Sequence, residues 1–375
     1  MKHMTPAYIY SIGTAVPPNK ILQEQVCNFM KNSRKLNRME NLKLHQIYRY
    51  SGINSRHTVI DDFLKQKGEY SFFSNAENME PEPPISRRME LYEKHALEIC
   101  NHAVWDCLSF IPRFNKKNIT HVVTFSCTGM SAPGLDIKVV ENFELDLNVE
   151  RTCINFMGCY AGINALKVAY HIIRSQPASK ILLVGVELCT LHYRNSNDFD
   201  QVVANAIFGD GASAVLVSAE DELLNQSGIK LELKTFYSEF ALEGRNDMVW
   251  SIADHGFNLK LSGNVPKMIK KEINGLIRKL FDRASLTQQD ISYYAIHPGG
   301  VKVLEACEDA LLIAKEQNHF SYEILKNYGN MSSVTVLFVL NQYLKKLTAE
   351  DKGKSLLSCA FGPGLTMESM ILKVA

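Results

Sequence analysis

Hydrophobic and polar positions give the chain two textures. From Gln23 to about Phe114 the sequence is polar and helix-prone, and within residues 87–108 apolar side chains recur near helical spacing. From His121 onward, short runs rich in Val and Ile appear between helical segments, among them HVVTFS, KILLVGVE and GASAVLV. Continuous apolar runs of this length are typical of strands that are buried on both faces. The pattern predicts an α/β protein.

A strand–helix–strand unit is predicted in the middle of the chain. Residues 162–177 carry apolar side chains at helical spacing and also off that stripe, so we expect a helix that is buried on most sides and ends at Pro177. Its first turn is expected to hold Cys159. The second half repeats this texture in the segments YYAIHPGG, SVTVLFVLNQYL and SLLSCAFGPGLTMESMILKVA. We therefore expect two halves, residues 1–225 and 226–375.

Length and charge narrow the class of protein. A chain of 375 residues is too long for one ordinary core, which agrees with two halves. Lys plus Arg number 41 and Asp plus Glu number 40, so the net charge of +1 gives no reason to expect nucleic acid as a partner. No apolar run approaches the ~18 residues of a membrane span, and the N-terminus lacks the pattern of a signal peptide.

The cysteines indicate a reducing compartment. There are nine of them, an odd number, and no two form a Cys-x-x-Cys pair. This argues against both a disulfide framework and a structural zinc site. We expect a cytoplasmic protein without a metal.

One cysteine has the surroundings of a nucleophile. Cys159 lies in the motif MGCYAG at the predicted start of the central helix. Unpaired N–H groups and the positive end of the helix dipole favour a thiolate there, and the flanking glycines allow a sharp turn. The alternative is a buried structural cysteine, because free cysteine is among the most buried residue types.

Two further motifs favour catalysis. IHPGG places His297 at the end of an apolar run, and NYGNMSS places Asn330 in a turn before an apolar helix. Taken singly, such a histidine is usually structural and such an asparagine is usually a turn or an N-cap residue. Together with Cys159 they supply a nucleophile, an imidazole and an amide.

Five motifs in order resemble one family. MGCYAG, FGDGASAV, IHPGG, NYGNMSS and FGPGLTME have the order and spacing of the type III polyketide synthases, the chalcone synthase-like enzymes. The resemblance covers essentially the whole chain. The stretch MVWSIADHGFNLKLSGNVP is similar to that of the bacterial branch.

The resemblance implies a fold and a chemistry. The fold is the thiolase fold, a five-layered α-β-α-β-α sandwich built from two fused halves with pseudo-twofold symmetry, usually as a homodimer. Cys159 is implied to take an acyl group from acyl-CoA, while His297 and Asn330 stabilise the enolate that malonyl-CoA forms as CO₂ leaves. A neutral amide suits that charge better than a carboxylate. No metal or redox cofactor is implied, and cyclisation ends the cycle.

The resemblance also implies a set of cavity residues. Phe208 matches a gatekeeper phenylalanine, whereas the second gatekeeper position holds Leu259, which predicts a wider passage. His192 replaces a smaller residue and is either a local acid or base or a packing residue. Trp250 belongs to the bacterial pattern, and its direction is left open. The further positions implied to contact substrate are Cys127, Thr128, Ala132, Glu187, Ser332, Gly362 and Pro363. We expect aliphatic acyl-CoA starters and an alkylpyrone or alkylresorcinol product.

CoA binding is the poorest match. Of three basic positions that plant members use for the CoA phosphates, only Lys43 is basic here, because the others are Gln46 and Tyr50. Arg49 and Arg56 are candidates to replace them. The alternative is that these cations form a solvated helix face.

Three other functions match part of this sequence pattern. Ketoacyl-acyl-carrier-protein synthase III shares the fold and the three catalytic residue types, but it usually has His-Gln-Ala-Asn where this chain has His-Pro-Gly-Gly. A papain-like protease uses Cys, His and Asn in the same order, but its cysteine lies near the mature N-terminus. A catalytically silent acyl-binding relative is disfavoured by the three intact catalytic residues.

Overall fold

A computed structural model describes residues 5–34, 36–220 and 226–375. Nine of its strands form one mixed sheet. They are β1 (Ala7–Ala15), β4 (His121–Ser126), β5 (Glu150–Asn155), β6 (Lys180–Leu188), β7 (Asp210–Ser218), β8 (Leu231–Phe240), β11 (Ile291–Ile296), β12 (Ser355–Gly362) and β13 (Thr366–Val374). Their order across the sheet is β11-β12-β13-β8-β1-β7-β6-β4-β5.

Ten α-helices accompany the sheet in the described residues. They are α1 (Gln23–Asn32), α2 (Arg38–Arg49), α3 (Ile85–Ser109), α4 (Leu135–Asn142), α5 (Ala161–Ser175), α6 (Phe199–Ile207), α7 (Val265–Ala284), α8 (Val301–Leu311), α9 (His319–Tyr328) and α10 (Thr335–Lys346). None of the helices in this part of the chain is long and apolar enough to cross a membrane.

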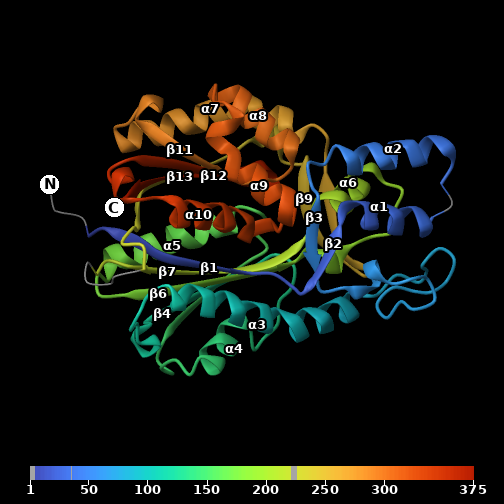
Figure 1. Cartoon of the computed structure of the whole chain (residues 1–375), viewed down its shortest axis with the longest axis horizontal. Helices are drawn as coiled ribbons and strands as arrows, with labels where there is room; N and C mark the ends of the chain where they lie inside the picture. Colours follow the sequence, from blue (N-terminus) through green and yellow to red (C-terminus); the bar gives the residue numbers. More distant parts are fainter. Residues whose placement is uncertain (1–4, 35, 221–225) are drawn as a thin grey trace.

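The elements stack in five layers (Figure 1). Helices α7 and α8 form one outer layer, and α3 and α4 form the other. Between them, the strands β11–β13 and the strands β1, β4, β6 and β7 make two sheet layers, with α5 and α10 in the middle. This is the predicted α-β-α-β-α sandwich, and its two sheet layers are continuous where β1 pairs with β8 over three residues.

Helix α10 is apolar on nearly every side and helix α5 is apolar on one broad face, because a sheet layer lies on either side of the pair. Nine of the twelve residues of α10 are buried, and α5 buries seven of fifteen. A helix that is hydrophobic all round must lie in a core. The apolar residues that lie off the helical stripe in these two segments are thus explained.

Two small sheets lie apart from the large one. One pairs β2 (Asn19–Leu22) with β3 (Ser55–Thr58), and the other is a hairpin of β9 (Met248–Ala253) and β10 (Gly256–Leu261). Both lie with α1, α2 and α6 at one end of the sandwich (Figure 1). The polar segment from Gln23 to about Phe114 thus holds three α-helices and the short strand β3 rather than helices only.

Candidate active site

A single cavity of about 430 Å³ contains all three predicted catalytic side chains. Cys159 comes from the turn between β5 and α5, His297 from the end of β11, and Asn330 from the turn after α9. The two halves of the chain therefore contribute to one site. This volume is within the range of small-molecule sites, about 300–1,000 Å³.

A strained turn presents Cys159. Gly158 has φ +82°, a left-handed conformation that glycine adopts without a steric penalty, and a Cβ there would collide with the ring of Pro363. Helix α5 begins at Ala161, so Cys159 lies just before the helix rather than in its first turn as predicted. The close packing against Pro363 fixes the turn that carries the thiol.

Burial sets the protonation state of the Cys159 thiol. It raises the pKa of Cys159 to about 11, while hydrogen bonds from the side chains of Ser332 and Asn330 lower that pKa. The cysteine is therefore a neutral thiol until a base takes its proton.

His297 is the imidazole that lines the same cavity. Its ring is buried, and neither Nδ1 nor Nε2 has a hydrogen-bond partner among the described residues. Burial lowers the pKa of His297 to about 3, so the imidazole is neutral and one ring nitrogen carries a lone pair. An unpaired buried imidazole costs stability, which is typical of a functional site. Once the thiol gives its proton to the ring, each charge stabilises the other.

The amide of Asn330 is fixed in orientation. Its Oδ1 accepts from the backbone N–H of Ser332 at 2.8 Å, so the amide nitrogen must point the other way. That nitrogen donates one hydrogen to the carbonyl of Gly299 at 3.3 Å, and the hydrogen bond from the Asn330 side chain to the Cys159 thiol uses the other side of the amide nitrogen. The cavity therefore has a preorganised neutral donor.

Arg56 has another role than the predicted contact with CoA. It is only 2% exposed, and its guanidinium donates to the carbonyls of Asn205 and Phe208 at 2.7 and 2.6 Å and to Gln23 at 2.9 Å. These bonds hold the end of α6, where Phe208 also forms a bridge with Asn330. The predicted phosphate contact is corrected, because these hydrogen bonds hold the Arg56 guanidinium inside the protein next to Phe208.

The predicted cavity residues separate into two groups. Those that line the cavity are Phe208, Leu259, Cys127, Thr128, Ser332 and Pro363. Those that do not are Ala132, Glu187, His192 and Gly362. Ala132 is exposed on a loop, and Gly362 packs against the ring of Tyr160. The expected direct contacts of Glu187, His192 and Gly362 with substrate are corrected accordingly, whereas Ala132 was expected to act from across a homodimer and stays a prediction.

Glu187 lies behind the cavity wall. Its carboxylate accepts from the backbone N–H of Cys127 at 3.0 Å, from the Thr128 hydroxyl at 2.9 Å and from the hydroxyl of Ser333. Burial raises the pKa of Glu187 to about 7. The sulfur of Cys127 accepts from the N–H of Gly158 at 2.9 Å, and burial raises the pKa of this thiol well above its usual value.

His192 is occupied by backbone groups. Its Nε2 lies 2.7 Å from the carbonyl of Thr128, and its Nδ1 accepts from the N–H of Phe257 at 3.1 Å. Burial lowers the pKa of His192 to about 3. Of the two roles considered for this histidine, the geometry favours packing over acid–base chemistry.

The cations at the cavity mouth differ from those predicted. Lys43 and Arg49 are exposed on α2 but do not line the cavity, whereas Ile47 and Tyr50 of the same segment do. Lys302, which the sequence analysis did not single out, lines the cavity at the start of α8 and pairs with Glu305 at 2.8 Å. A lysine two residues after the IHPGG motif was the available signal.

Other lining residues were also missed. Cys189 adds a third thiol to the wall, and Trp250, whose direction was left open, faces the cavity. Several apolar residues complete the lining. Met248, Leu261, Val265 and Pro266 lie in the stretch MVWSIADHGFNLKLSGNVP, and six others lie outside the recognised motifs: Phe199, Val203, Ile207, Ile269, Val301 and Val303. Helical spacing in α6 was the only sequence signal for some of them. Within the described residues no three His, Cys, Asp or Glu side chains gather as a metal site.

The family models of the chalcone and stilbene synthases match nearly all of the chain. The N-terminal domain model matches residues 2–221 and the C-terminal domain model matches residues 232–375. These matches support neither a papain-like protease nor a ketoacyl-acyl-carrier-protein synthase.

Similar proteins include bacterial, plant and amoebal polyketide synthases. The alpha-pyrone synthesis polyketide synthase-like Pks18 of Mycobacterium tuberculosis is 28% identical over 99% of this chain and 92% of its own length. Type III polyketide synthase 21 of rice is 31% identical over 98% and 93%. Probable polyketide synthase 1 of Dictyostelium discoideum is 30% identical over 98% of this chain, which spans only 11% of that longer protein.

Solved structures agree with the fold. The C-terminal type III polyketide synthase domain of Steely1 from Dictyostelium superposes with a TM-score of 0.89 at 29% identity, covering 98% of this chain and 99% of that one. PKS-I from the brown alga Ectocarpus siliculosus has a TM-score of 0.90 at 24% identity over the full length of both, which shows the shared fold. This chain is a condensing acyltransferase of the thiolase fold and belongs to the chalcone and stilbene synthases, the type III polyketide synthases.

Proposed function

We propose that this enzyme loads an acyl group from acyl-CoA onto Cys159, extends it with malonyl-CoA and cyclises the product to an alkylpyrone or alkylresorcinol. The observation that carries the proposal is the joint presence, in one buried cavity, of a thiol, an imidazole with both ring nitrogens unpaired, and an oriented amide donor. Enzymes of this family use CoA thioesters, and the proposed chemistry needs no metal or redox cofactor.

Loading begins with proton transfer. The Cys159 thiol gives its proton to the neutral ring of His297, and the thiolate attacks the thioester carbon of acyl-CoA. The carbon–sulfur bond to CoA breaks, and the CoA thiolate leaves with the proton held by the imidazole. Burial helps here, because it excludes water that would hydrolyse the acyl-cysteine.

Extension depends on two donors. As malonyl-CoA loses CO₂, the electron pair of the breaking bond moves onto the thioester oxygen, and the His297 ring and the amide hydrogen of Asn330 that faces Cys159 donate to that oxygen. The enolate carbon then attacks the acyl-cysteine carbonyl, which releases the Cys159 thiolate and lengthens the chain by two carbons.

The lining of the cavity supports an aliphatic starter. On α6, Phe199, Val203 and Ile207 recur every fourth residue and present one apolar face, and Val265 and Ile269 of α7 add to it. Such a surface binds methylene groups at about 0.8 kcal/mol each. The name of Pks18 describes alpha-pyrone synthesis, and we extend that product class to this chain.

For the CoA phosphates we propose Lys43 and Arg49 of α2 together with Lys302. Lys43 lies one helical turn before Ile47, and Lys302 follows the lining residues Gly300 and Val301, so both belong to the segments that frame the cavity. All three side chains are exposed and can reach a polyphosphate at the mouth.

Domain bounds, assembly and location are also proposed. We propose two halves, residues 1–225 and 226–375, and a cytoplasmic location. We further propose a homodimer formed through the outer edge of β5, the last strand of the sheet in the described residues. In support, five of the six residues of β5 are exposed. All nine cysteines are free thiols, as a reducing compartment requires.

Intact-protein mass spectrometry tests the nucleophile. Cys159→Ala should lose the acyl adduct that forms with dodecanoyl-CoA and should make no product from malonyl-CoA. Cys189→Ser is the matched control, because this thiol lines the same cavity, and it should still carry one adduct. An adduct of equal yield on Cys159→Ala, with product at the wild-type rate, would overturn the assignment.

A further inference from the structure

The β9–β10 hairpin forms part of the cavity wall without belonging to the large sheet. Its residues Met248, Trp250, Leu259 and Leu261 line the cavity, yet its two strands pair only with each other within the described chain. A two-stranded hairpin is marginal by itself, so side-chain contacts must hold it in place.

His192 makes one of these contacts. It links the hairpin to the loop after β4, because one ring nitrogen lies 2.7 Å from the carbonyl of Thr128 and the other accepts from the N–H of Phe257. The ring also stacks on that of Phe257, with centroids 4.1 Å apart and planes 9° apart. Only a neutral ring fits, since a second N–H would face the N–H of Phe257.

Trp250 makes a similar contact with the same loop, at Cys127, the residue before Thr128. Its indole N–H donates to the carbonyl of Cys127 at 2.8 Å, and its ring meets that of His192 edge to face. The sulfur of Cys127 in turn accepts from the N–H of Gly158, next to the catalytic cysteine. The hairpin is thus fastened to the same loop that supports the nucleophile.

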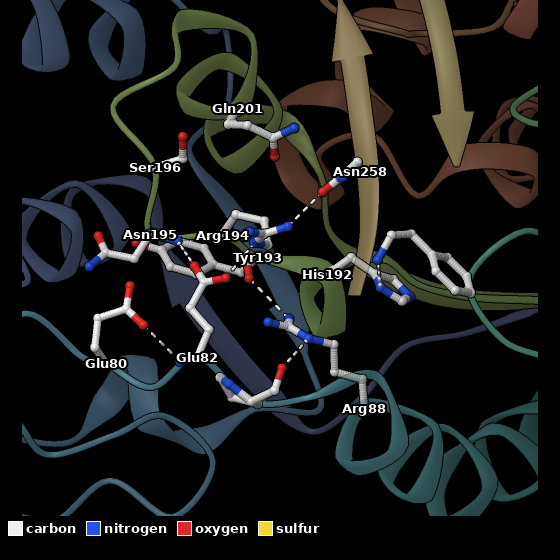
Figure 2. Close-up of polar contacts among 12 residues, drawn as sticks. Glu80, Glu82, Arg88, His192, Tyr193, Arg194, Asn195, Ser196, Gln201 and Asn258 are labelled. Carbon is white, nitrogen blue, oxygen red and sulfur yellow. Dashed lines mark hydrogen bonds and ion pairs between the residues drawn. The ribbon is translucent and has the colours of Figure 1, made fainter. Parts of the chain in front are cut away.

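A buried arginine holds His192 from behind. Arg88 of α3 is 0% exposed, and its guanidinium donates to the carbonyls of Leu191 and Tyr193, the two neighbours of His192. Figure 2 shows Arg88 pointing from its helix toward His192 and Tyr193. The match is close, because a Cβ on Gly256 would lie 2.8 Å from Nε of Arg88.

An ion pair fixes the adjoining residue. Arg194 pairs with Glu82 and donates to the side-chain oxygen of Asn258 on β10 at 2.6 Å (Figure 2). The segment from Leu191 to Arg194 is therefore bound on one side to α3 and the loop before it, and on the other side to the hairpin.

A second, smaller cavity of about 30 Å³ lies behind this wall. It is lined by His192 and Tyr193, and it shares four residues with the large cavity: Cys189, Phe208, Trp250 and Leu259. The two cavities are therefore neighbours that have these four side chains in common.

We propose that Arg88 and His192 are positioning residues that hold Trp250 as the stop that limits the length of the bound acyl chain. The inference rests on the proposed function and names its specificity device. Trp250 closes the large cavity, His192 fixes the hairpin that carries it, and Arg88 fixes His192. Loss of the stop lets an acyl chain enter the rear space.

The test compares starter preference across variants. Trp250→Ala and His192→Ala should shift the optimum of kcat/KM to longer acyl-CoA starters, with a gain of about fourfold for each methylene that enters the opened space. His192→Gln can donate to Thr128 and accept from Phe257 and should keep the wild-type optimum. Trp105→Ala is the matched control, because that tryptophan is 58% exposed and far from the cavity lining.

Three readouts separate the outcomes. CO₂ release from malonyl-CoA and the adduct on Cys159 report the proposed function, while the optimum starter length reports the stop. A wild-type enzyme without adduct or CO₂ overturns the proposed function and the stop with it. Retained adduct and CO₂ with the same optimum in wild type, Trp250→Ala and His192→Ala overturns the stop only. Trp250→Leu replaces Trp250→Ala if the latter does not fold. A shift of its optimum to longer starters supports the stop, and an unchanged optimum with retained adduct and CO₂ overturns it.

Discussion

At the residue scale, the proposed chemistry depends on groups that burial keeps neutral. The pKa of Cys159 is raised and that of His297 is lowered, both by burial, so the thiol and the imidazole are both neutral at rest. Asn330 differs, because its orientation is fixed by the N–H of Ser332 before any substrate binds. The sequence identified all three side chains from family motifs. It could not reveal the orientation of the amide, which depends on a turn geometry seen only in the fold.

Asn330 is predicted to serve the enolate rather than acyl loading. Asn330→Ala should lower malonyl-CoA decarboxylation by about 10²-fold, the usual effect of losing one such donor, ~3 kcal/mol, while loading of Cys159 changes much less. Asn330→Asp keeps the shape but replaces the donor by oxygen, and it should be at least as slow. Rapid-quench measurement of adduct formation beside ¹⁴CO₂ release distinguishes the steps. Equal losses in both would mean that Asn330 mainly positions the thiol and imidazole.

Glu187 is predicted to make stability fall as pH rises. Its folded-state pKa of about 7 lies above the ordinary value of 4.5, so the folded protein binds more protons than the unfolded chain between these values. Stability is therefore highest for this group below pH 4.5 and declines by about 3 kcal/mol by pH 8. Urea unfolding of Glu187→Gln across pH 5–8 should lack this decline. The same slope in wild type and variant would contradict the assignment.

At the element scale, the sequence predicted the buried helices and strands well and the connecting elements poorly. The strongly periodic α5 and α10 were recognised because core burial leaves a clear apolar pattern. The β9–β10 hairpin carries exposed and buried residues in an irregular order, and its place on the cavity depends on contacts with distant segments. The burial of Arg56 was missed for the same reason, since carbonyls of α6 are its partners.

The turn before α5 gives a prediction at this scale. Gly158→Ala should abolish acyl loading and lower the melting temperature, because alanine at φ +82° costs about 1–2 kcal/mol and its Cβ collides with Pro363. Gly275→Ala is the control. It lies inside α7 with no atom within 4 Å of the added Cβ, so it should stabilise the protein by about 0.5–1 kcal/mol. Calorimetry and adduct mass on both variants provide the check. Normal loading by Gly158→Ala would show that the turn tolerates displacement.

At the scale of the whole molecule, the active site exists only because two halves meet. The thiol belongs to the first half, and the imidazole and amide belong to the second, while β1 and β8 join the two parts of the sheet. The order of the motifs MGCYAG, IHPGG and NYGNMSS already indicated that segments far apart in the sequence form one site. The proposed stop was not visible there, because the direction of Trp250 toward the cavity and its hydrogen bond to the carbonyl of Cys127 depend on the fold, whereas Leu259 suggested a wider cavity.

The free edge of β5 gives the last prediction, a homodimer built by pairing this strand with its copy. The N–H groups of Glu150 and Phe156 point inward to carbonyls on the β4 side, so by alternation the N–H of Cys153 points outward. Cys153→Pro removes an outward donor and leaves the inner ladder intact, which proline allows at an edge. It should give a folded single chain, whereas wild type sediments at twice that mass. Thr152→Pro breaks the inner ladder and should unfold the protein. A Cys153→Pro variant that still sediments as a dimer would move the interface elsewhere.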